Sequence, residues 1–153
     1  MDTLRLDQIL ADYSNRGVMR LVVGAIMVRT RPMRVLVLRR VGGDEYGGIE
    51  ELPSGAVEGA ETFGQALHRE VLEETGIRVR TVGRFLFDFV YPSRSGTTAQ
   101  LNFLVPVPDG TVVRLDSREH VSYRWLTSDS VPHSDLTGNV KALLLDSLRH
   151  LSA

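Results

Sequence analysis

The chain has 153 residues, of which 42% are hydrophobic and 24% charged, and its net charge is −1. This composition is ordinary for a globular protein and leaves no broad basic surface for extended nucleic acid or an anionic membrane. Without cysteine the chain forms no disulfide and uses no thiolate, which favours a cytoplasmic location. No apolar run is long enough to cross a bilayer, and the first residues lack the pattern of a secretory signal. We expect one domain over residues 1–153.

Helical and strand-like patterns alternate along the chain. Apolar spacing predicts an amphipathic helix over residues 4–15, ending near Gly17. Apolar and β-branched runs predict strands at 19–28, 35–40, 79–90, 99–107 and 120–126. A last helix is expected over 136–151. Because the helices interrupt the strands without strict alternation, we expect a mixed sheet covered on both faces.

A helix in the middle of the chain carries an unfavourable set of charges. Thr62 and Gln65 have the spacing of a capping box, and Gly76 can end the helix. Within it Glu70, Glu73 and Glu74 lie on one face at i, i+3 and i+4, so like charges repel. Nothing local offsets this cost, which a divalent cation held by the carboxylates would remove. A solvated acidic face is the simpler alternative, but these charges adjoin the apolar stripe of the helix.

The segment from Gly55 to Ile77, GAVEGAETFGQALHREVLEETGI, resembles the Nudix box, G-x5-E-x7-R-E-U-x-E-E-x-G-U with U a bulky aliphatic. Every specified position matches: Gly55, Glu61, Arg69, Glu70, Val71, Glu73, Glu74, Gly76 and Ile77. The resemblance implies an α/β Nudix fold, an α/β/α sandwich with a mixed β-sheet. It also implies a metal-dependent hydrolase that cleaves the diphosphate linkage of a nucleoside diphosphate derivative by water attack at phosphorus.

By the same resemblance, Glu70, Glu73 and Glu74 are the ligands of Mg²⁺ or Mn²⁺, together with the backbone carbonyl of Gly55. Hard, oxygen-ligated cations neutralise a diphosphate and acidify bound water. Arg69 is expected to orient the carboxylates as a further member of the catalytic group.

The general base is left open between two glutamates. Glu119 precedes the strand over 120–126, where related enzymes often place such an acid, but an exposed loop carboxylate explains it equally well. Glu73, flanked by anions and metals, is the rival. The histidines show no metal-ligand spacing, and His68 and His120 are interpreted as structural or solvated.

Five residues are candidate substrate contacts, each with a simpler alternative. Arg39 and Arg40 end a strand and alternate between its faces, so one could bind phosphate or both could be solvated. Arg94 lies in a loop and could reach a phosphate or a terminal sugar. Tyr91 could stack on a base, although an aromatic here is more often core or rim. Asn139 could read a base or cap the last helix.

The substrate class remains open at this point. A nucleoside triphosphate, ADP-ribose or a nucleotide sugar would each fit, and Pro92, fifteen residues after Ile77, tilts slightly towards ADP-ribose. The alternative is a sensor that binds a nucleotide without cleaving it; such relatives usually show a degraded box, and this box keeps every carboxylate. We expect a small nucleotide partner, no extended nucleic acid and no membrane, and a homodimer is possible through the apolar face of the first helix.

Overall fold

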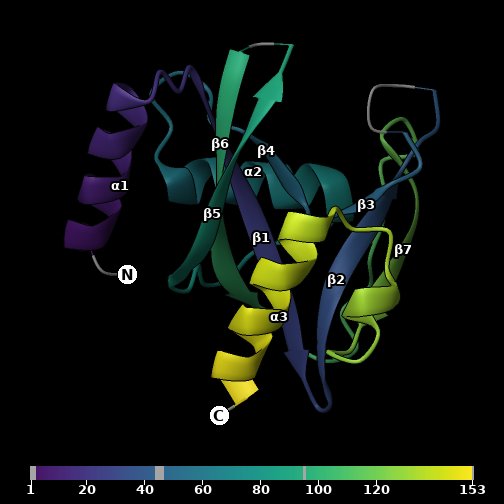
Figure 1. The fold of residues 1–153 in the computed structure, drawn as a ribbon. Helices are drawn as coiled ribbons and strands as arrows, with labels where there is room; N and C mark the ends of the chain where they lie inside the picture. Colours follow the sequence, from purple (N-terminus) through teal and green to yellow (C-terminus); the bar gives the residue numbers. More distant parts are fainter. Residues whose placement is uncertain (1–2, 44–46, 95, 153) are drawn as a thin grey trace.

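The computed structural model describes residues 3–43, 47–94 and 96–152. Three α-helices and one short 3-10 helix surround a sheet in the described residues (Figure 1). In chain order the elements are α1 (Thr3–Asn15), β1 (Arg20–Thr30), β2 (Met33–Arg40), β3 (Glu50–Glu51), β4 (Ser54–Ala56), α2 (Phe63–Thr75), β5 (Phe85–Ser93), β6 (Gly96–Pro106), β7 (His120–Leu126), η1 (Val131–His133) and α3 (Gly138–Ser152).

The sheet is mixed, as the sequence predicts, and it opens where the central strands diverge. Its order is β3-β2-β1-β6-β5, with β4 also paired to β1 and β7 to β2. β1 and β6 run parallel, and the other pairs are antiparallel. β1 and β2 pair only beside their hairpin, from Val28 opposite Val35 to Thr30 opposite Met33. Beyond that point β1 pairs with β4 and β2 pairs with β3, so the segment containing Gly55 lies between the two central strands.

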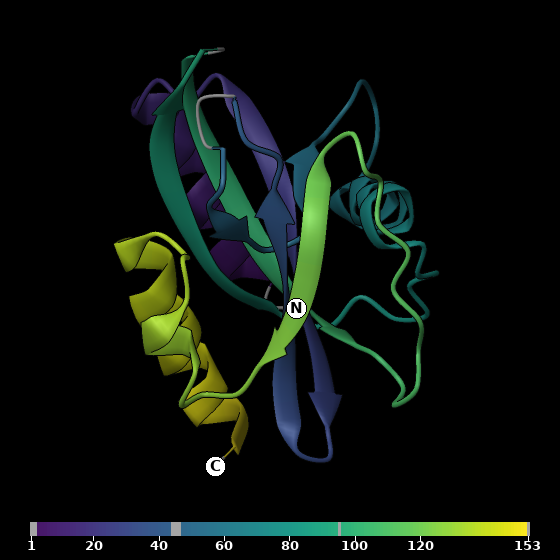
Figure 2. The same cartoon turned by 90° about the vertical axis from the view of Figure 1, so that its right-hand side faces the viewer.

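Helices cover both faces of the sheet, which gives the expected α/β/α arrangement. Figure 2 shows α3 on one side of the strands and α2 on the other. The core on the α2 side includes Leu67 and Val71 of α2 and Leu6 and Tyr13 of α1. The core on the α3 side includes Leu144. Two apolar layers on a shared sheet bury enough surface to fix the strands and therefore the segments between them.

The central helix begins and ends where the sequence predicts. The hydroxyl of Thr62 accepts from the backbone N–H of Gln65, and the Gln65 side chain accepts from the N–H of Thr62. Gly76 ends the helix with φ of 70°, a left-handed conformation that glycine adopts without strain. Both ends of α2 are therefore specified locally, which fixes the axial position of its acidic residues.

The predicted strand over 79–90 is wrong in its first half. β5 begins only at Phe85, and residues 79–84 cross towards it without regular structure. The N–H of Gly83 donates to the carbonyl of Leu104 at 2.7 Å, and a Cβ at Gly83 would lie 2.8 Å from that oxygen. Residues 79–84 therefore lie closely against β6, although they form no strand themselves. The sequence patterns also did not predict the short strands β3 and β4 or the 3-10 helix.

The first helix uses its apolar face within the chain. Leu6 and Tyr13 are buried against the sheet, and the Tyr13 hydroxyl donates to the Asp88 carboxylate of β5. The homodimer stays a prediction, but the apolar face of the first helix no longer supports it because that face packs within the chain. In the described part of the chain, no helix is long and apolar enough to span a membrane.

Strand β6 carries three buried polar side chains on its α3 face: Thr98, Gln100 and Asn102. The Gln100 amide nitrogen donates to Asn102 Oδ1 at 2.9 Å, and the Asn102 amide donates to the carbonyl of Phe87 at 3.2 Å. Gly24, the register partner of Asn102 on β1, leaves the space for them. A Cβ there would lie 2.1 Å from Asn102 Oδ1 and 2.5 Å from the Gln100 nitrogen.

Gly24→Ala is therefore expected to destabilise the protein by about 1 to 3 kcal/mol, because the added methyl must displace a buried hydrogen-bonded pair. Urea unfolding followed by circular dichroism measures the change. Gly42→Ala is the control: a Cβ there meets no atom within 4 Å, so its midpoint should match the wild type. Equal midpoints for both variants would show that the Gln100–Asn102 pair can move aside without a loss of stability.

Candidate active site

A cleft of about 740 Å³ lies where α2, the open part of the sheet and the start of α3 meet. Its lining includes both acidic residues and arginines. Its charged lining residues are Arg20, Arg40, Glu50, Glu51, Glu58, Glu70, Glu74, Arg94, Arg118 and Glu119. Because cations and anions are both present, the cleft suits a ligand that carries negative charge and is bound together with a metal ion.

Strand β4 lies very close to α2 at Gly55. A Cβ added to Gly55 would lie 1.9 Å from the carboxyl carbon of Glu70 and within 2.3 Å of both of its oxygens. Only glycine allows this approach, which brings the backbone of β4 and a carboxylate to the same wall of the cleft. Backbone carbonyls and carboxylates are the oxygen donors that hard divalent cations prefer.

Arg69 holds the surrounding acids in position. Its guanidinium donates to both oxygens of Glu61 at 2.8 Å, to Glu70 Oε1 at 2.6 Å and to the carbonyl of Ala56 at 2.9 Å. The hydrogen bonds from Arg69, with the Glu58 N–H, lower the pKa of Glu61 to about 2. Burial raises the pKa of Glu70, and the contacts with Arg69 oppose this. Arg69 thus joins the loop to the helix, and it opposes the rise in the Glu70 pKa that burial causes.

Glu74 occupies the most buried acidic position of the site. Its carboxyl accepts from the N–H of Ser54 at 2.7 Å, and the residue is only 4% exposed. Burial raises the pKa of Glu74 to about 10; the Ser54 N–H opposes this, and the Glu51 and Glu119 carboxyls add to it. An acid with such a pKa holds a proton at neutral pH.

Of the three predicted carboxylate ligands, Glu70 and Glu74 line the cleft and Glu73 does not. Glu73 is more exposed and lies 3.6 Å from the same Arg69 nitrogen that bonds Glu70. Within the described ranges, the site where three acidic or histidine side chains offer atoms within 4.8 Å of one another is formed by Glu51, Glu74 and His120. The buried carboxylates and the Gly55 backbone fit a divalent cation. The ligand role of Glu73 stays a prediction.

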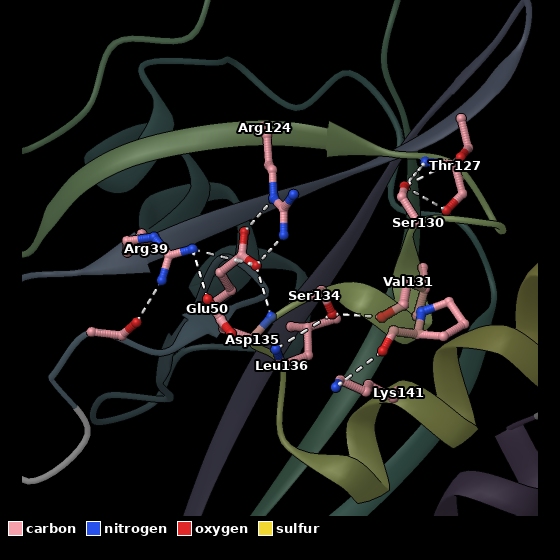
Figure 3. Close-up of polar contacts among 12 residues, drawn as sticks. Arg39, Glu50, Arg124, Thr127, Ser130, Val131, Ser134, Asp135, Leu136 and Lys141 are labelled. Carbon is pink, nitrogen blue, oxygen red and sulfur yellow. Dashed lines mark hydrogen bonds and ion pairs between the residues drawn. The ribbon is translucent and has the colours of Figure 1, made fainter.

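An ion pair between the buried Glu50 and the exposed Arg124 supports another wall of the cleft (Figure 3). Glu50 accepts two hydrogen bonds from the Arg124 guanidinium, at 2.6 and 2.7 Å, and one from the N–H of Asp135 at 2.9 Å. These contacts, the Arg124 hydrogen bonds first, lower the pKa of Glu50. Arg39 binds Asp135 at 2.9 Å and the carbonyl of Gly48 at 2.7 Å. Arg39 thus serves this network and does not line the cleft; its substrate role stays a prediction.

The other predicted contacts do gather in the cleft. Arg40, Tyr91, Arg94 and Asn139 line it, and so does the predicted base Glu119. Their roles stay predictions. Asn139 lies in the first turn of α3 and accepts from the Thr137 hydroxyl at 2.9 Å, so it is held by its neighbour.

Comparison with known proteins places this geometry in a family. A family model described as the NUDIX domain matches residues 18–146. The chain belongs to the Nudix family. A putative 8-oxo-dGTP diphosphatase 2 from Mycobacterium tuberculosis is 32% identical over 133 residues, which are 86% of this chain and 89% of that protein. The MutT protein from Methanosarcina mazei has the same fold, with a TM-score of 0.76 at 22% identity over 88% of this chain and 96% of that one.

A further relative of this Nudix chain is much longer. An NAD-capped RNA hydrolase NudC from Klebsiella pneumoniae is 34% identical over 100 residues, which are 65% of this chain. The matched segment covers only 37% of that protein. The family and fold expected from the box are thereby confirmed.

Sequence reasoning missed four residues of this Nudix site. Arg20 and Arg118 line the cleft but sit in no motif. Gln100 also lines the cleft, and His120 is buried beside two acids. One signal was readable for Gln100: the alternation Thr98, Gln100, Asn102 puts polar groups on one face of a central strand, which is typical of a strand facing a cleft.

Glu61→Gln tests the electrostatic role of Arg69. The folded pKa of Glu61, about 2, lies below its ordinary 4.5, so its ion pair stabilises the fold above pH 4.5 and is lost as pH falls towards 2. We expect the variant to unfold at lower urea than wild type at pH 7, and the difference to shrink below pH 4.5. Glu58→Gln, an exposed neighbour, is the control. A difference independent of pH would mean that Glu61 acts through its shape alone.

Proposed function

We propose that this Nudix chain is a metal-dependent hydrolase that cleaves the diphosphate linkage of a nucleoside diphosphate derivative. The observation that carries the proposal is the approach of the Gly55 backbone to the Glu70 carboxylate at the wall of a charged cleft. A side chain at position 55 would push the Glu70 carboxylate away from this backbone, so the glycine is what lets the two groups lie side by side. The match of the complete box to the family model supports the same reaction.

In this proposal Mg²⁺ or Mn²⁺ binds Glu70, Glu74 and the Gly55 carbonyl. Such a cation supplies charge neutralisation and a more acidic water. Arg69 keeps Glu70 in place by the 2.6 Å hydrogen bond. Arg40, Arg94 and the other arginines of the cleft bind phosphate oxygens.

Glu119 is proposed as the general base in preference to Glu73, because Glu119 lines the cleft and Glu73 does not. A carboxylate inside the cleft can take a proton from the attacking water. The water oxygen forms a bond to phosphorus, the bridging P–O bond breaks, and the leaving phosphate carries away the bridging oxygen and the bonding electrons.

The nucleoside is proposed to lie at the sheet end of the cleft. Phe89 and Tyr91 on β5 have ring centroids 5.8 Å apart, and both line this part of the cleft. Gln100 lies opposite Phe89 in the β5–β6 register. The carbonyl of Phe87 can only accept, so Asn102 must donate to it and Gln100 must donate to Asn102. The remaining hydrogen-bonding capacity of the Gln100 amide is therefore held in a fixed direction for a base edge.

Among the candidate substrates we place nucleoside triphosphates first, since the Mycobacterium tuberculosis relative named as a diphosphatase of 8-oxo-dGTP matches over 89% of its length. ADP-ribose and nucleotide sugars come next. NAD and NAD-capped RNA belong in the same test because of the NudC relatives. A net charge of −1 speaks against extended RNA as the main ligand.

The activity is tested with a substrate panel and Mg²⁺ or Mn²⁺, using a coupled phosphatase to convert products to phosphate. We expect metal-dependent turnover of one substrate group, reduced about 10²- to 10⁴-fold by Glu119→Gln because the base is lost. Glu70→Gln should also abolish turnover, whereas Glu73→Gln should retain most of it. Asp146→Asn, on the exposed part of α3, is the control.

If folded wild type bound a nucleotide and metal but released no phosphate, the sensor alternative would replace the hydrolase. If Glu73→Gln lost activity and Glu119→Gln kept it, the assignment of the base would be reversed.

Gln100→Leu tests the position of the base. We expect KM for the preferred nucleotide to rise about 10-fold or more, because a base edge loses its partner, while kcat changes little. Steady-state kinetics on the preferred nucleotide and on a counterpart that keeps its ribose and full phosphate chain but lacks the base measures this, since a substrate without a base should not be affected. Equal effects on both substrates would place the base elsewhere.

A further inference from the structure

One ring nitrogen of His120 is hydrogen-bonded. The other faces an acid but makes no hydrogen bond. Its side chain is fully buried, at 0% exposure, at the start of β7. Nε2 lies 2.8 Å from Glu51 Oε1, while Nδ1 lies 3.8 Å from Glu74 Oε2 and makes no hydrogen bond in the structure. A buried polar atom left unpaired is unusual in a folded protein, so this nitrogen calls for an explanation.

The contact with Glu51 decides the protonation of the ring. A carboxylate only accepts hydrogen bonds, and Glu51 Oε1 also accepts from Arg40 at 3.1 Å, so Nε2 must carry the proton of the His120–Glu51 contact. In a neutral imidazole, Nδ1 then presents its lone pair. The atom facing it, Glu74 Oε2, is a carboxyl oxygen. At 3.8 Å the Glu74 carboxyl makes no hydrogen bond to Nδ1, whichever of its oxygens holds the proton, so lone pairs of both groups face the same buried space.

The spacing of these two donors matches ligands on one cation. Two donor atoms each about 2.1 to 2.2 Å from an ion lie roughly 3 to 3.8 Å apart at ordinary coordination angles. A direct hydrogen bond would need a much shorter distance than the 3.8 Å observed. In metal sites a ligating histidine donates its other ring N–H to a carboxylate, and Glu51 stands in that place.

We infer that His120 is a nitrogen ligand, together with Glu74, for a first-row divalent transition ion such as Mn²⁺, and that Glu51 orients the imidazole. The inference rests on the proposed function only in sharing Glu74 with its metal site. An imidazole ligand favours transition ions over Mg²⁺, which prefers oxygen donors. The chain therefore selects Mn²⁺ over Mg²⁺ beyond what carboxylates alone would give.

Electron spin echo spectroscopy of protein-bound Mn²⁺ tests the ligand directly, without substrate. We expect coupling to a directly bound nitrogen, altered when the protein is labelled with ¹⁵N-histidine. His120→Gln can keep a donor to Glu51 but lacks Nδ1, so it should lose the coupling and bind Mn²⁺ about 10- to 100-fold more weakly. Mg²⁺ affinity should change far less. His68→Gln, on the exposed side of α2, is the matched control and should keep the coupling.

Bound Mn²⁺ without histidine coupling in wild type, or coupling that persists in His120→Gln, would overturn the inference. The wild-type ¹⁵N comparison decides the matter even if His120→Gln does not fold. Turnover in the substrate panel with no nitrogen coupling would leave the hydrolase standing and remove only this ligand. Nitrogen coupling without turnover would keep His120 as a metal ligand and remove the proposed hydrolase activity.

Discussion

The arrangement of the site depends on one cation, the guanidinium of Arg69. It bonds a loop acid, a helix acid and a backbone carbonyl of β4 at once, so it ties the loop and β4 to α2. Charge-assisted hydrogen bonds are stronger than neutral ones, and a planar fork fits a carboxylate with little loss of side-chain freedom. The apolar cores place α2 against the sheet only approximately. Arg69 supplies the finer positioning that brings Glu70 to the backbone of Gly55.

Around this contact, the carboxyl groups differ in protonation according to how deeply they are buried. Glu61 is kept anionic by Arg69, whereas Glu74 is driven towards its neutral form by burial. Charges of one sign within a few ångströms can be tolerated because they are not all ionised at once. Another wall of the cleft rests on a different device, the Glu50–Arg124 pair, which holds the connection from β7 to α3. The two walls are thus stabilised independently.

The sequence was most informative where structure is specified locally. The box, the capping box at Thr62 and the glycine at 76 predicted α2 and the family, and alternating apolar runs predicted most strands. It failed where contacts are distant. The approach of His120 to Glu51 and Glu74 joins residues that lie far apart in the chain, and no spacing reveals it. Arg39 and Arg40 look equivalent in sequence, yet the pleat sends them to different partners.

The absence of a side chain at Gly24 links β1 to β6 in any redesign of the cleft. Because the amides of Gln100 and Asn102 fill the volume that a side chain at residue 24 would occupy, a change at any one of the three positions alters the space or the hydrogen bonds of the other two. A library that alters nucleobase preference through Gln100 should therefore randomise residues 24 and 102 with it. In a natural family such a trio would be inherited as a unit, and divergence at one member would mark a lineage whose ligand has changed.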